Sequence, residues 1–136
     1  MIFIDTNIFL RTILNDHPEF SSACKRLFLR IKNGELDGIT TDLTVAEAVF
    51  ILQKQSKFVF SRTDITGVLL PLLKLSHLNS SSQNLWEQIF TIFVKKNVDF
   101  IDAYNMVVMK AAGIEKAYTY DHDYSKVGLL ERLEPR

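Results

Sequence analysis

The first seven residues, MIFIDTN, place a carboxylate and two small polar side chains directly after four apolar residues. A run that is apolar at every position is typical of a strand in a parallel sheet that is covered on both faces. A helical pattern of apolar residues follows over positions 7–14. Because ligands bind beyond the carboxyl ends of the strands in such sheets, Asp5 stands where a site would lie.

Strand-like and helix-like segments alternate along the rest of the chain. Helices are expected at residues 18–32, 42–55, 62–74, 80–96 and 101–112, and strands at 36–41, 116–120 and 130–135. This alternation predicts an α/β fold in which a central parallel sheet is flanked by helices. The 136 residues contain no internal repeat and no long linker, so we expect a single domain over residues 1–136.

Composition limits the classes of function. The chain has 16 Lys and Arg against 16 Asp and Glu, so its formal net charge is zero. Nucleic-acid binders often carry a strong basic excess, so binding here would need a local basic patch or a bound cation. The single cysteine, Cys24, cannot form a disulfide within the chain and is expected to be buried on a helix. No secretory signal or bilayer-length apolar run is visible, and we expect a cytoplasmic protein.

Four carboxylates follow predicted strands or lie early in predicted helices: Asp5, Glu47, Asp102 and Asp121. Each has an ordinary structural alternative, namely a helix cap for Asp5 and Asp102, a capping box for Glu47 and a turn for Asp121. Glu47 and Asp102 have apolar sequence neighbours, where ionised groups are rare unless they are paired. No Lys or Arg is adjacent to any of the four. If the four converge, their repulsion requires a cation, and a hard ion such as Mg²⁺ or Mn²⁺ suits carboxylates.

The segments that carry these acids resemble, in order, the four acidic signatures of the PIN-domain ribonucleases. This family includes the VapC-type toxins of bacteria and archaea. The segments are FIDTN, TVAEAV, DFIDAYNMVVMKAAG and AYTYDHDYSKV, and the resemblance runs from Ile2 to about Leu129. It implies a PIN-like three-layer α/β/α fold with a central parallel sheet, and metal-dependent cleavage of RNA by an endoribonuclease.

The resemblance also implies roles for individual residues. The four carboxylates would be catalytic and would hold one or two Mg²⁺ or Mn²⁺ ions. Neighbouring polar groups would orient them through hydrogen bonds: Thr6, Asn7, Thr119 and Asp123. Asp123 would also be able to share the fourth acidic role with Asp121. For RNA contacts we expect Arg11, on the helix that leaves the site, and Tyr104, which is bulkier than the small residue expected there.

The expected partners and the alternatives follow from the same resemblance. A VapC-type toxin of a type II toxin–antitoxin pair would form a homodimer and bind a small antitoxin. A stand-alone RNA-processing nuclease and a catalytically silent scaffold remain open. A phosphotransferase of the haloacid-dehalogenase kind is disfavoured because Asn7 stands where it needs a second aspartate. A Rossmann module is disfavoured because no glycine-rich loop follows the first strand.

Overall fold

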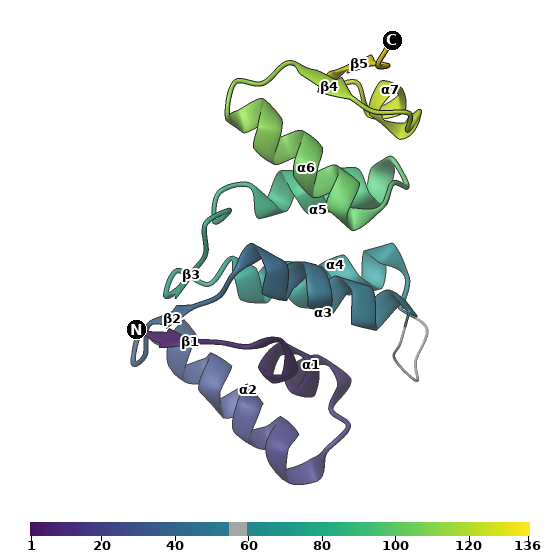
Figure 1. Ribbon diagram of the computed structural model, residues 1–136. Coiled ribbons are helices and arrows are strands. Elements are labelled where there is room, and N and C mark those ends of the chain that lie inside the picture. The colour runs from purple at the N-terminus through teal and green to yellow at the C-terminus, as the bar shows by residue number, and fades with distance from the viewer. Residues whose placement is uncertain (55–59) are drawn as a thin grey trace. The chain divides into compact units, whose positions relative to one another are not determined.

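The computed structural model describes residues 1–54 and 60–136, which form two compact units, Met1–Gln83 and Asn84–Arg136. The positions of the two units relative to one another are not determined (Figure 1). In the described part of the chain, no helix combines the length and the apolar character needed to cross a membrane.

A three-stranded parallel sheet in the order β1-β2-β3 lies in the first unit. Its strands are β1 (Ile2–Phe3), β2 (Gly38–Ile39) and β3 (Leu78–Asn79). A Cβ atom at Gly38, in the central strand, would lie 3.0 Å from the Leu78 side chain and 3.2 Å from that of Ile4, so a larger residue at this position would require these side chains to shift. The expectation of a buried first strand is wrong for β1, because both of its residues, Ile2 and Phe3, are 53% exposed at the edge of the sheet. Only Ile4, directly after the strand, is buried, with 1% exposed.

Helices of the first unit begin and end at residues that suit these positions. They are α1 (Thr6–Leu14), α2 (Pro18–Lys32), α3 (Asp42–Lys54) and α4 (Arg62–Leu73). Helix α2 has proline at its first position, where the missing N–H costs nothing, and it is followed by Gly34 with φ +75°. Helix α4 starts with a capping box between Ser61 and Asp64. Helix α3 packs against both α1 and α4, and it lies beside α4 in Figure 1.

The second unit is built on an aromatic core and a two-stranded parallel sheet. Its elements are α5 (Trp86–Lys95), α6 (Phe100–Ala111), β4 (Lys116–Tyr118), α7 (Asp123–Val127) and β5 (Glu131–Leu133). The rings of Phe90 and Phe100 are 5.1 Å apart and those of Trp86 and Phe100 6.5 Å apart, so α5 and α6 are joined by aromatic contacts. Phe100 opens α6, and this packing therefore fixes the first turn of that helix.

Each strand pair in the described residues is parallel, and strands alternate with helices, so the predicted α/β class is confirmed. Cys24 is buried on α2, as expected. The prediction of one domain over residues 1–136 stays a prediction.

Candidate metal centre

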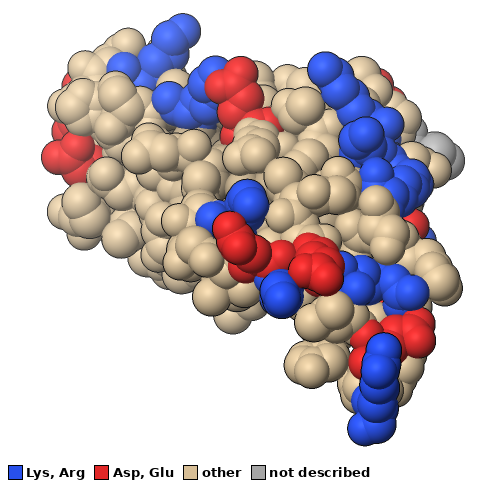
Figure 2. All heavy atoms as spheres, turned by 90° about the horizontal axis from the view of Figure 1, so that it is seen from above, with Lys and Arg blue, Asp and Glu red and all other residues tan. Residues whose placement is uncertain are grey.

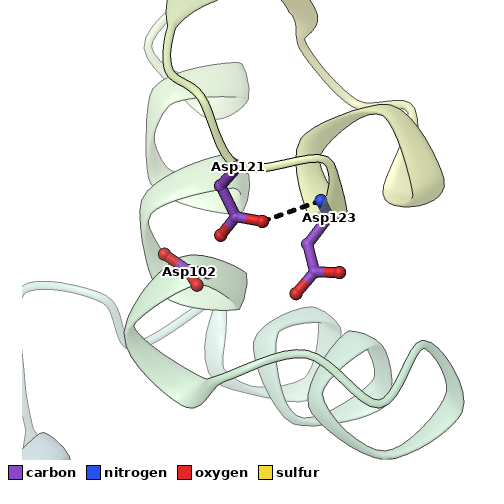
Figure 3. Close-up of side chains that lie close together, drawn as sticks. All are labelled: Asp102, Asp121 and Asp123. Atoms are coloured by element: carbon purple, nitrogen blue, oxygen red, sulfur yellow. Dashed lines mark hydrogen bonds between the residues drawn. The ribbon is translucent and has the colours of Figure 1, made fainter.

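Three carboxylates of the second unit converge: Asp102, Asp121 and Asp123 (Figure 3). One ligand oxygen from each residue lies within 4.8 Å of those from the other two. Asp102 stands in the first turn of α6, Asp121 follows β4, and Asp123 opens α7. Two helices and the connection between β4 and α7 therefore contribute one acid each to what we term the aspartate cluster, which is defined by these three residues.

Local hydrogen bonds determine how the chain turns after β4. The backbone N–H of Thr119 donates to the Leu133 carbonyl at 2.9 Å, which extends the pairing with β5 by one residue. The Thr119 hydroxyl accepts the backbone N–H of Asp121 at 3.0 Å. Asp121 Oδ1 in turn accepts the backbone N–H of Asp123 at 2.9 Å. Thr119 thus holds the backbone of Asp121, whereas the sequence led us to expect that it would orient the carboxylate directly.

The aspartate cluster is electrostatically unfavourable without a cation. Burial raises the pKa of the Asp102 carboxyl, and the negative charges of Asp121, Asp99 and Asp123 raise it further. Burial also raises the pKa of the adjacent Tyr124 hydroxyl, with the charge of Asp102 as the next cause. Among the described residues of this unit, no Lys or Arg forms an ion pair with a member of the cluster. The repulsion is therefore not relieved by a basic side chain, and the oxygen donors fit a hard divalent cation.

Asp5 and Glu47 belong to the first unit. Asp5 lies between β1 and α1, and its Oδ1 accepts the backbone N–H of Thr6 at 2.8 Å, so it caps α1 as the structural alternative requires. Glu47 is exposed in the interior of α3. Helix α3 begins at Asp42, so Thr44 is inside the helix and its backbone N–H bonds to Thr41. Thr44 and Glu47 therefore do not form the capping box that the sequence also allowed.

The remaining candidate residues have varied surroundings. Thr6 is buried, whereas Asn7 is exposed at the start of α1. Arg11 already pairs with Asp16, at 2.8 Å between Nη1 and Oδ2. Tyr104 is half-buried, and its ring centre is 6.2 Å from that of Trp86. Arg11 and Tyr104 therefore already make contacts within the fold. Either residue would have to bind RNA while it keeps these contacts.

The surface charge agrees with the neutral composition. Figure 2 shows both acidic and basic side chains on the face that it presents. Because the formal net charge of the chain is zero, binding of a polyanion would depend on local contacts.

Comparisons with known proteins identify the family. The crystal structure of VapC20 from Mycobacterium tuberculosis, described as a sarcin-ricin loop cleaving toxin, is 22% identical, with a TM-score of 0.42. That alignment covers 99% of this chain and 100% of VapC20. No curated protein sequence matches the chain significantly. The sequence model of the PIN domain matches residues 2–130. Because that match spans nearly the whole sequence, the chain belongs to the PIN domain family.

Proposed function

We propose that this protein is a metal-dependent endoribonuclease that hydrolyses phosphodiester bonds of RNA. The observation that carries the proposal is the aspartate cluster, whose ligand oxygens lie within 4.8 Å of one another, in a member of the PIN domain family. Oxygen ligands without a basic partner in their unit suit Mg²⁺ or Mn²⁺, and one or two such ions are proposed here.

The proposal assigns Asp5, Glu47, Asp102 and Asp121 to catalysis and to cation binding. The backbone N–H of Asp123 donates to Asp121 Oδ1 and so helps to hold that carboxylate in place. Asp102 is raised in pKa by burial and by its neighbours, so a cation stabilises its ionised form. Asp5 and Glu47 are included because they match acidic positions in the motifs of the family. Thr6, Asn7, Thr119 and Asp123 are assigned to holding these carboxylates in place.

The chemistry is phosphodiester hydrolysis. A bound divalent ion would lower the pKa of a water molecule and offset the charge that develops on the phosphate. The residues of the chain orient the ligand oxygens: Thr119 fixes the backbone of Asp121, and the turn to Asp123 fixes one of its carboxylate oxygens. Preorganised ligands need no rearrangement when the substrate arrives, and this is the source of their catalytic effect.

A cleavage assay tests this proposal. Purified protein is incubated with labelled single-stranded RNA in EDTA, Mg²⁺ or Mn²⁺. Cleavage is expected only with a divalent ion, and Asp102→Asn and Asp121→Asn are expected to abolish it while the far-ultraviolet circular dichroism is unchanged. Glu115→Gln is the matched control, because it neutralises an exposed acid of the same unit outside the cluster. Full cleavage by Asp102→Asn, or cleavage that persists in EDTA, would contradict the proposal.

We further propose that the nuclease is the toxin of a type II toxin–antitoxin pair, that it acts in the cytoplasm as a homodimer, and that a cognate antitoxin inhibits it. Induced expression in a bacterial host is expected to arrest growth, whereas Asp102→Asn is expected to be harmless. Cleavage in vitro without growth arrest would favour a stand-alone RNA-processing nuclease. Absence of both cleavage and growth arrest would favour a catalytically silent scaffold. Sedimentation velocity measures the mass in solution and so tests whether the protein is a dimer.

A further inference from the structure

A pocket of about 660 Å³ lies at the carboxyl end of the β4–β5 sheet. It is lined by Tyr118, Arg132 and residues 133–136. Pockets of this size are typical of sites for small molecules or for one unit of a polymer. The pocket is outside the aspartate cluster, and none of the roles assigned above uses it. We refer to it as the Tyr118 pocket.

The Tyr118 pocket and the aspartate cluster are close along the chain. Strands β4 and β5 are parallel, with Tyr118 opposite Leu133, so both reach their carboxyl ends at the same edge of the sheet. Asp121 is three positions after Tyr118, and three extended residues span at most about 10 Å. If an RNA strand binds with one phosphate at the aspartate cluster, a nucleotide one or two positions further along the strand would therefore reach the Tyr118 pocket.

The chemistry of the lining suits a nucleotide. Tyr118 is 73% exposed, and an exposed aromatic ring can stack on a base of any sequence. Arg132 Nη1 donates to the Thr119 carbonyl at 3.1 Å and to Glu134 at 2.7 Å. Among the described residues both of its hydrogen bonds use Nη1, so the Nη2 and Nε donors remain for a phosphate. Arg136 adds a second, exposed guanidinium to the same pocket.

The anchoring of Arg132 makes the pocket a formed site. Its side chain is 16% exposed and is tied to the backbone of the same loop that positions Asp121. Thr119 is the shared element, since its carbonyl accepts from Arg132 and its hydroxyl accepts from the Asp121 backbone. A group bound by Arg132 is therefore held at a defined position relative to Asp121 of the aspartate cluster.

We infer that the Tyr118 pocket binds one unpaired nucleotide of the RNA strand next to the phosphodiester that is cleaved, by stacking on Tyr118 and by phosphate contacts to Arg132 and Arg136. This inference rests on the proposed ribonuclease function and adds a site for one nucleotide beside the bond that is cleaved. The base in that site must be unpaired, because a paired and stacked base cannot offer its face to the tyrosine ring.

Binding is measured by fluorescence anisotropy with a labelled 12-nucleotide single-stranded RNA, on the Asp102→Asn background with Mg²⁺ so that cleavage is suppressed. Tyr118→Ala is expected to weaken binding roughly 5- to 150-fold, as the loss of one stacked base does. Tyr118→Phe keeps the ring and is expected to bind within about twofold of the parent. The matched control is Phe20→Ala, which removes an exposed aromatic residue of α2 outside the pocket.

Several results would overturn the inference. These are unchanged binding by Tyr118→Ala, an equal loss in Tyr118→Phe, an equal loss in Phe20→Ala, and equal affinity for a duplex of the same sequence. If Tyr118→Ala fails to fold, Arg136→Gln tests the same pocket: the slope of log affinity against log salt is expected to fall by about 0.7, as for one phosphate contact, and an unchanged slope overturns the inference. Cleavage by the wild type is assayed in parallel. Wild-type cleavage with no effect of the pocket variants rejects the pocket alone, whereas absence of cleavage rejects the proposed function.

Discussion

Neutralising Asp102 is expected to make the metal-free protein more stable. Burial disfavours the charged carboxylate, and the charge of Asp121 adds to this, so the pKa of Asp102 is raised in the folded state. The change Asp102→Asn keeps the shape of the side chain and removes its charge. The variant should therefore gain the free energy that the wild type loses by ionising a carboxylate beside other carboxylates.

The geometry gives the size of this effect. Ligand oxygens in the cluster are within 4.8 Å of one another. Two unit charges at that separation repel by about 0.9 kcal/mol in water and by about 3.5 kcal/mol at an effective dielectric constant of 20. Because these side chains are partly exposed and salt screens them, the lower figure is closer. A gain of about 1 kcal/mol in the free energy of unfolding raises the Tm of a chain of this length by roughly 3 to 5 °C.

The sign of the pH dependence follows from the raised pKa. The folded state holds its proton on Asp102 to higher pH than the unfolded state, so the unfolded state binds fewer protons in that interval. Wild-type stability therefore falls, relative to Asp102→Asn, as the pH rises above the ordinary aspartate value of 3.8 and through the raised pKa. Below 3.8 the carboxyl is protonated in both states, and the difference between wild type and variant should vanish.

Thermal unfolding followed by circular dichroism measures this in EDTA at pH 3 and pH 7, with Glu115→Gln as the control. When Mn²⁺ is added, the wild type should become more stable than Asp102→Asn, because an ion at ten times its dissociation constant stabilises the wild type by about 1.4 kcal/mol. If metal-free Asp102→Asn is less stable than the wild type at pH 7, the carboxylate has a structural role and the reasoning is refuted.

Three further substitutions test the packing and the turn around the site. Trp86→Ala removes a fully buried ring and should cost about 3 to 5 kcal/mol in a urea unfolding experiment; a loss under about 1 kcal/mol would contradict the aromatic core. Gly38→Ala places a Cβ atom 3.0 Å from Leu78 and should lower stability by about 1 to 3 kcal/mol, so an unchanged urea midpoint would be inconsistent with the sheet geometry. Asp121→Ala loses the acceptor for the Asp123 N–H and should be less stable than Asp121→Asn by about 1 kcal/mol; equal melting temperatures would disprove that hydrogen bond.

The sequence predicts the long helices well because their signals are local. The stop at Asn33 and Gly34 and the proline at the start of α2 depend only on nearby backbone geometry. Strand β3 lies in a stretch, HLNSSSQN, that has the composition of a loop. Its two residues form a strand because Leu78 and Asn79 pair with β2, which is 40 residues away in sequence. Helix α7 has five residues and begins at an aspartate-rich turn, so no periodic pattern could reveal it.

For the site, the sequence placed Asp102 and Asp121 in one set of acids and named Asp123 as able to share the role of Asp121, and these three carboxylates lie together in the structure. The rule that ligand-binding groups gather at strand ends applied to Asp5 and Asp121, and the meeting of those two stays a prediction. The ion pair between Arg11 and Asp16 was not predictable. It depends on the left-handed turn at Asn15, with φ 50°, which brings the end of α1 back toward the following residues. The Tyr118 pocket was also missed, because it is formed by the pairing of β4 with β5 and not by a sequence motif.

The most direct measurement of the central claim is a crystal structure of the protein grown with Mn²⁺, in which anomalous scattering locates the ion. The account predicts manganese coordinated by Asp102 and Asp121, with Asp5 and Glu47 bound to it directly or through water. Manganese held by other residues, or no manganese at saturating concentration, would contradict the claim that these four acids form one metal centre for one or two cations.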